Sequence, residues 1–206
     1  MRFEKILYLF ACLFVMPAYA DVDCLPYKLT PKIVLETPTW SKEVVQPFEQ
    51  MELLHGNVVA TFVDNYDIVA DITNIEDGYC VTLKSVYATV GYSDFLVQID
   101  IRNAPESCTY NAILSHEDEH IRAYLSVMDD FKKELTDSIY VAADSIPPIF
   151  VRSPNDIDAA IDELNAELQA HPDLILVKQK IKAAEEIRNK RVDQHDRGQS
   201  LQKCFE

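Results

Sequence analysis

The chain has 206 residues, of which 48% are hydrophobic, and a formal net charge of −15 at pH 7. This length is enough for one domain with a sizeable hydrophobic core. So acidic a chain is a poor partner for nucleic acid or for an anionic membrane surface, and we exclude both from its expected partners.

The first twenty residues have the parts of a secretory signal peptide. A basic start precedes an unbroken apolar run over residues 6–16, and Ala18-Tyr19-Ala20 is a small-x-small cleavage site. We expect cleavage after Ala20, which leaves 186 residues with a net charge of −16 in the periplasm or outside the cell. The apolar run is too short to span a bilayer, and no second long one follows. A lipoprotein signal ending at Cys12 is the alternative, although it uses only half of the apolar run.

Four cysteines remain after this cleavage: Cys24, Cys80, Cys108 and Cys204. An even number in an exported chain indicates two disulfides, and four cysteines allow three pairings, among which the sequence does not choose. Cys24 and Cys204 lie near the two ends, so the bridges should tie the termini to the body. Zinc binding by these cysteines is disfavoured because no C-x-x-C spacing occurs.

The first half of the mature chain is rich in segments typical of strands. We expect a strand over residues 32–37 and a helix over residues 41–54, in which Pro47 marks a kink. Residues 58–64 and 66–72 are rich in Val, Ile, Phe and Tyr, which predicts two further strands.

A turn over residues 76–78 and a strand over residues 79–90 follow. Gly91-Tyr92-Ser93-Asp94 predicts a second turn. Phe95, Val97, Ile99 and Ile101 then alternate with Leu96, Gln98, Asp100 and Arg102, which is the clearest strand pattern in the chain.

One long helix is predicted over residues 109–145. This segment contains no Gly and no Pro, and its apolar residues recur at spacings of three and four. Ser107 is the expected N-cap.

This helix carries His116-Glu117-Asp118-Glu119-His120, an H-E-x-x-H motif. Residues four apart lie on one helix face, so His116 and His120 can bind one metal ion together. Glu117 lies between them and can act as the general base that takes a proton from water, the arrangement of zinc metallopeptidases. The alternative is a helix that carries two histidines by chance.

Pro147-Pro148 ends the helical region, and two further helices are predicted over residues 157–168 and 174–197. His171-Pro172-Asp173 separates them, so we expect an αα-hairpin with charged outer faces. The resulting organisation is a signal peptide over residues 1–20, an α+β domain over residues 21–150 and a C-terminal helical hairpin over residues 151–206.

Several short motifs follow one another over residues 75–130: Cys80-x-x-Leu83, Gly91-Tyr92, Val97-x-Ile99, Ser107-Cys108-x-Tyr110 and His116-Glu117-x-x-His120. In this order they resemble an uncharacterised family of secreted bacterial zinc-dependent proteases. The resemblance implies a zincin-like fold, in which a twisted sheet packs on the metal-binding helix, in the bacterial cell envelope. The edge strand of such a sheet lies along the substrate groove. Residues 95–102 are our candidate for that edge strand, and a core strand is the alternative.

A catalytic zinc site needs three protein ligands and an open position for water, and the third ligand is not evident. Ala123 stands where the extended motif H-E-x-x-H-x-x-G-x-x-H requires glycine, which excludes a metzincin. Asp129 is nine residues beyond His120, about 13 Å along a straight helix, and is too distant. Asp130 and Glu134 are farther still. Candidates from other segments are Asp158, Asp162, Glu163, Glu186, Asp193 and His195.

Two functions therefore remain open. One is a zinc metallopeptidase that acts on peptides or proteins in the envelope, with Tyr124 as a candidate donor to the oxyanion. The other is a zincin-like scaffold that binds a partner without catalysis. Metal storage is disfavoured because histidine is scarce outside the motif. A third histidine or an acidic side chain within ligand distance of both His116 and His120 favours the enzyme. Apolar side chains covering the pair favour the scaffold.

Overall fold

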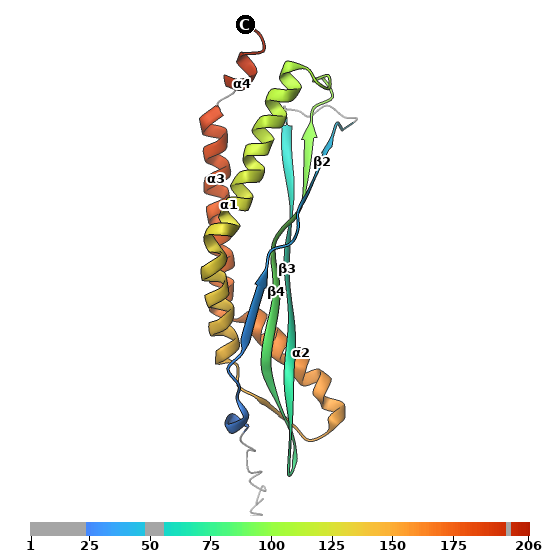
Figure 1. Cartoon of the computed structure of the whole chain (residues 1–206), viewed down its shortest axis with the longest axis vertical. Coiled ribbons are helices and arrows are strands. Elements are labelled where there is room, and N and C mark those ends of the chain that lie inside the picture. Colours follow the sequence, from blue (N-terminus) through green and yellow to red (C-terminus); the bar gives the residue numbers. More distant parts are fainter. Residues whose placement is uncertain (1–23, 48–55, 197–198) are drawn as a thin grey trace, which may run out of the picture.

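The computed structural model describes residues 24–47, 56–196 and 199–206. The elements in chain order are β1 (Lys32–Glu36), β2 (Ser41–Val45), β3 (Gly56–Ile75), β4 (Gly78–Ile99), α1 (Cys108–Ser145), β5 (Ile149–Val151), α2 (Ile157–Ala170), α3 (Pro172–Asp196) and α4 (Gln199–Gln202). Short 3-10 helices lie at Leu25–Tyr27 and Pro154–Asp156. One mixed sheet packs against the helices, in agreement with the expected α+β class (Figure 1).

A long antiparallel hairpin, β3 and β4, is the backbone of the sheet. The two strands pair along their whole length, and a tight turn at Glu76-Asp77 joins them. Because β3 occupies one edge of β4 throughout, the other three strands must share the opposite edge. There β1 and β2 run parallel to β4, and β5 runs antiparallel to it. β4 is thus the central strand, and β3 is an edge strand.

Two β-bulges keep one face of β4 apolar along its length. The pairing with β3 shifts register at Ser93 and again at Lys84, so each is an extra residue on β4. An extra residue would turn the following side chains to the other face unless the alternation also shifted. The buried apolar positions shift at the same two points: 81 and 83, then 86, 88, 90 and 92, then 95, 97 and 99.

Some expected strands differ from the observed ones. Residues 58–64 and 66–72 belong to one continuous strand, β3. The turn expected at residues 91–94 is wrong, because these residues lie within β4 at its bulge. Residues 95–99 pair with β2 on one side and β3 on the other, so the edge-strand hypothesis for 95–102 is wrong and the core-strand alternative holds.

The helix expected over residues 41–54 is also wrong where the structure describes it. Ser41–Val45 form β2, which pairs with β4 from Asp94 to Gln98. Residues 48–54 lie outside the described residues. Val44 packs against the core, and pairing to a neighbouring strand overrides the helical periodicity that the sequence suggests.

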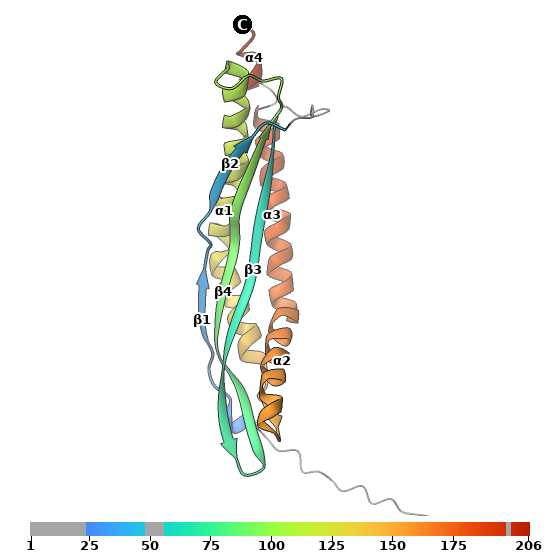
Figure 2. The ribbon, with the colours of Figure 1, turned by 90° about the vertical axis from the view of Figure 1, so that its right-hand side faces the viewer.

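α1 and α3 lie side by side along the sheet and run in opposite directions (Figures 1 and 2). α1 covers the helix expected over residues 109–145, and its N-cap is Ser107, whose hydroxyl accepts a hydrogen bond from the Tyr110 N–H. α1 begins at the end of the molecule where α3 ends. Residues near the start of α1 therefore lie beside residues near the end of α3.

The C-terminal helices share one core with the sheet and α1. α2 contributes Leu164 and Leu168, and α3 contributes Leu174, Val177 and Ile181. The expected αα-hairpin is wrong, because α3 continues from α2 at an angle instead of folding back beside it (Figure 1). His171 alone separates the two helices, and one extended residue is too short a link for a reversal.

Two disulfides are present, as expected, and they join Cys24 to Cys80 and Cys108 to Cys204. They tie the segments near both termini to the body of the protein. Among the described residues, no helix combines the length and apolar character needed to cross a membrane.

Leu135 tests the shared core. Its side chain is fully buried on α1, whereas Leu176 on α3 is 49% exposed. We expect Leu135→Ala to lower the free energy of unfolding by about 2–5 kcal/mol, since it leaves a cavity. The matched Leu176→Ala should change it by roughly 0.5 kcal/mol or less. Chemical denaturation measures both, and equal effects would contradict the described packing.

Candidate metal centre

The antiparallel register of α1 and α3 decides which side chains meet at the H-E-x-x-H motif. Polar pairs mark this register: Glu134–Lys180, Asp130–Arg188 and His120–Asn189. Each pair is closer than the one before to the start of α1 and to the end of α3. The last turn of α3 therefore lies over the two histidines of the motif.

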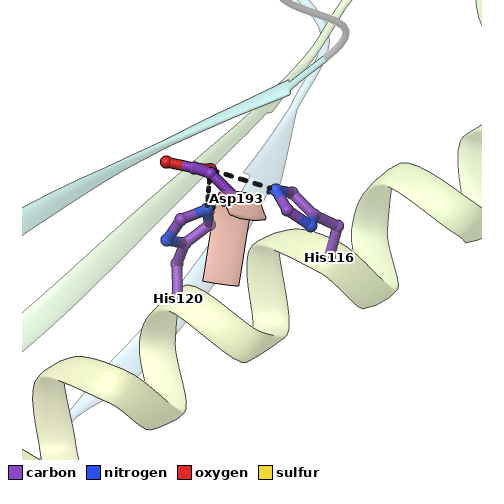
Figure 3. A group of neighbouring side chains, drawn as sticks. All are labelled: His116, His120 and Asp193. Carbon is purple, nitrogen blue, oxygen red and sulfur yellow. Dashed lines mark hydrogen bonds and ion pairs between the residues drawn. The ribbon is translucent and has the colours of Figure 1, made fainter. Parts of the chain in front are cut away.

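Three ligand atoms converge there, one from each of His116, His120 and Asp193 (Figure 3). The Nε2 atoms of the histidines are 3.2 Å apart. Asp193 Oδ1 lies 3.1 Å from His120 Nε2 and 3.5 Å from His116 Nε2. A tetrahedral ion with bonds of about 2.0–2.1 Å holds its ligand atoms about 3.3 Å apart. The group could therefore hold one metal ion and leave its fourth position open.

Asn189 fixes the orientation and the tautomer of His120. Its side-chain oxygen is 2.8 Å from His120 Nδ1, and its amide nitrogen donates to the Glu185 carbonyl. With the oxygen facing the ring, this hydrogen bond forms with the tautomer of His120 that carries its proton on Nδ1. The lone pair of His120 is then on Nε2, the atom that faces Asp193 and His116.

Asp196 faces the Nδ1 atom of His116, as Asn189 faces that of His120, but at a longer distance. Its Oδ2 is 3.6 Å from His116 Nδ1, a buried nitrogen with no hydrogen bond in the described part of the chain. Its Oδ1 accepts hydrogen bonds from the Ser200 N–H and hydroxyl. A carboxylate beside the distal nitrogen of a ligating histidine is a common outer partner in metal sites.

Glu117 is only 4% exposed and lies against the first residue of β3. A Cβ atom at Gly56 would be 2.5 Å from Glu117 Oε1, so only glycine allows this approach. Burial raises the pKa of the Glu117 carboxyl above its ordinary value, and the neighbouring His120 and His116 oppose that rise.

On the other side of α1, Lys42 of β2 forms a 2.9 Å ion pair with Asp118. Both edges of the sheet thus hold this turn of the helix.

The group opens into a pocket of about 400 Å³, bordered by the start of β3, α1, the end of α3 and α4. Besides the three possible ligands, its lining includes Gly56, Val58, Ile113, Glu117, Tyr124 and Leu201. The Tyr124 ring packs against Tyr92, with ring centroids 5.0 Å apart. Burial raises the pKa of the Tyr124 hydroxyl, so it remains a hydrogen-bond donor at neutral pH.

Of the third-ligand candidates taken from the sequence, the structure brings Asp193 to both histidines. Glu186 and His195 lie on the same helix but outside the group, and the α2 candidates Asp158, Asp162 and Glu163 are at the other end of the molecule (Figure 1). Asp130 and Glu134 form ion pairs with α3 instead.

Three residues of the site, Gly56, Asn189 and Asp196, were not predicted from the sequence. Asn189, Asp193 and Asp196 recur at spacings of four and three, so they share one face of α3. This polar stripe, on the face of α3 that packs against α1, is the sequence signal that could have identified Asn189 and Asp196.

No protein-family model, no curated protein and no solved structure matches this chain. The functional interpretation therefore rests on the geometry of this centre.

Asp193 is the possible ligand that is easiest to test. Asp193→Ala removes one of three donors, and we expect the affinity for a divalent metal to fall by more than about 100-fold, beyond the usual cost of losing an outer partner. Glu186→Ala on the same helix is the matched control and should bind as the wild type does. Competition with a chromophoric chelator measures both affinities. Unchanged binding by Asp193→Ala would exclude this residue as a ligand.

Proposed function

We propose that this protein is a zinc-dependent metallopeptidase with a zincin-like arrangement of sheet and metal-binding helix. Its substrates are peptides or proteins of the bacterial cell envelope. One observation carries the proposal: a carboxylate of α3, Asp193, lies within ligand distance of both histidines of the H-E-x-x-H motif. This is the arrangement that favours an enzyme over a scaffold.

The donor set supports zinc over calcium and magnesium. Two imidazoles and one carboxylate at tetrahedral spacing, with a fourth position open, match catalytic zinc sites. Calcium and magnesium prefer six or more oxygen ligands. The two disulfides agree with an exported protein, since disulfides persist in oxidising compartments.

Bound zinc would supply Lewis acidity, which makes a water acidic near neutral pH and polarises the scissile carbonyl. Glu117 accepts the proton of the attacking water and later delivers it to the leaving amine. Its burial suits both steps, because a raised pKa brings the carboxyl closer to the working pH. Tyr124, one turn beyond His120, is the candidate donor to the developing oxyanion.

The free edge of β3 supports a peptide as the substrate. In the described part of the chain β3 pairs only with β4, and Gly56, Asn57 and Val58 at its start line the pocket. An extended peptide can add to such an edge through main-chain hydrogen bonds. β3 takes the role that the sequence analysis assigned to residues 95–102.

One observation favours the alternative of a non-catalytic scaffold. The sheet face opposite the helices exposes Val59, Val69 and Tyr87, each between 44% and 47% accessible. Exposed apolar side chains on one face suit a binding surface. A scaffold, however, has no need of a buried carboxylate beside three convergent ligand atoms.

Glu117→Gln separates the two functions. The variant keeps the shape of the side chain and all three ligands but removes the base. We expect zinc content to stay and peptide hydrolysis to fall by about 10²–10⁴-fold. Glu134→Gln, farther along α1 and outside the pocket, is the matched control and should cleave normally. If the wild type binds no zinc, or if Glu117→Gln cleaves as well as the wild type, the metallopeptidase proposal is wrong.

Gly56→Ala tests the contact between β3 and the base. The added methyl group would displace Glu117 and Ile113 without touching a ligand. Hydrolysis should fall at least about ten-fold, since small misplacements of catalytic groups are costly. Zinc content and the thermal unfolding midpoint should stay near wild type. Wild-type hydrolysis by this variant would show that the position of Glu117 does not limit the reaction.

A further inference from the structure

The two disulfides differ in exposure and in place. Cys24 and Cys80 are 5% and 0% exposed and lie away from the metal centre, where β4 pairs with β5. Cys108 is exposed and Cys204 half-buried, and their bridge lies at the end of α1 that carries the H-E-x-x-H motif. Thiol reagents reach exposed disulfides far more readily than buried ones. The accessible bridge is therefore the one beside the centre.

A chain of contacts links this bridge to the ligands. Cys108 lies eight residues, about two helical turns, before His116 on α1. Cys204 follows α4, where Ser200 donates two hydrogen bonds to Asp196 Oδ1. The other oxygen of Asp196 faces His116 Nδ1 at 3.6 Å. A continuous series of contacts thus runs from the disulfide through Ser200 and Asp196 to His116.

The end of α3 needs such a support. α3 ends at Asp196, so Asp193 and Asp196 both lie in its last turn, where backbone carbonyls lack helical partners and helices fray. The Asp193 side chain is 62% exposed, so packing encloses only part of it. The Cys108–Cys204 bridge is the covalent tie between the start of α1 and the end of α4.

We propose that the Cys108–Cys204 disulfide controls the metal affinity of the His116, His120 and Asp193 centre, and that Asp196 is a positioning residue for His116. With the bridge formed, the last turn of α3 is held over the histidines and the centre binds metal tightly. With the bridge reduced, Asp193 and Asp196 move away from the histidines and binding weakens. This inference rests on the metal site of the proposed function and not on hydrolysis.

The redox step is an ordinary thiol–disulfide exchange. The Cys108 and Cys204 thiols lose two protons and two electrons as the sulfur–sulfur bond forms, and a disulfide oxidant takes them up as it becomes a dithiol. The centre would thus mature where the surroundings are oxidising and stay weak where thiols are kept reduced.

The experiment compares zinc affinities of the full mature protein, measured against a chromophoric chelator at neutral pH. We expect the Cys108→Ser/Cys204→Ser double variant to bind zinc at least about ten-fold more weakly than the wild type, the lower end of the cost of disturbing outer partners. Cys24→Ser/Cys80→Ser, which lacks the buried bridge, is the matched control. It should unfold at a lower temperature yet bind zinc as the wild type does.

Reversible reduction of the wild type covers the case in which a double variant does not fold. A phosphine reductant should expose two thiols, mapped to Cys108 and Cys204, with the same fall in affinity. Oxidised glutathione should then restore both the bridge and the affinity.

Asp196→Asn tests the positioning role while the bridge stays intact. It keeps an acceptor for Ser200 but removes the charge beside His116, so zinc should bind about 10–100-fold more weakly. The visible spectrum of the cobalt-substituted protein should change as well, because it reports the ligand geometry. Asp137→Asn, exposed on α1, is the matched control and should leave both unchanged.

The outcomes separate this inference from the proposed function. Equal zinc affinity with and without the Cys108–Cys204 bridge overturns the inference and leaves the peptidase proposal intact. Equal losses in both double variants also overturn it, because the bridge would then act through stability alone. If the oxidised wild type binds no zinc, the metal centre itself is wrong and both proposals fail.

Discussion

The packing of α3 against α1 is the constraint on which the candidate centre depends. The H-E-x-x-H motif brings only two possible ligands, and both come from successive turns of α1. The carboxylate that completes the group comes from the far end of α3, and the antiparallel register alone brings it there (Figure 3). A slip of one helical turn, about 5.4 Å, would set Asn189 over the histidines instead of Asp193. Buried apolar residues of both helices, among them Leu135 and Val177, resist that slip.

The sheet sets the second condition, which is the burial of Glu117. β3 and β2 hold the first turns of α1 from opposite edges, one through the bare backbone of Gly56 and the other through the Lys42–Asp118 ion pair. The carboxylate is therefore enclosed while the histidines beside it remain open to the pocket. One turn of α1 thus presents the enclosed Glu117 beside two histidines that face the pocket. The strands cover the part of the helix that carries Glu117, and α3 lies over the histidines.

Features fixed by neighbouring residues could be predicted from the sequence. α1, its cap at Ser107 and the shared face of His116 and His120 follow from local periodicity. Features fixed by distant pairing could not. The sequence of β2 taken alone favours a helix, and its pairing with β4 makes it a strand. Residues 91–94 have the composition of a turn, although they lie within β4 at its bulge. Asp193 was one of six candidates because the choice depends on a register that tertiary packing sets.

The β3–β4 hairpin sets the candidate centre far from the opposite end of the molecule. At about 3.3 Å per residue, the 22 residues of β4 extend roughly 70 Å, from the Glu76-Asp77 turn to the end beside the metal centre. The turn is exposed, and no residue of the candidate centre lies near it (Figure 2). An affinity tag or a fluorophore inserted at that turn would leave the centre untouched. The molecule can thus be immobilised by its tip with its chemistry facing away from the support.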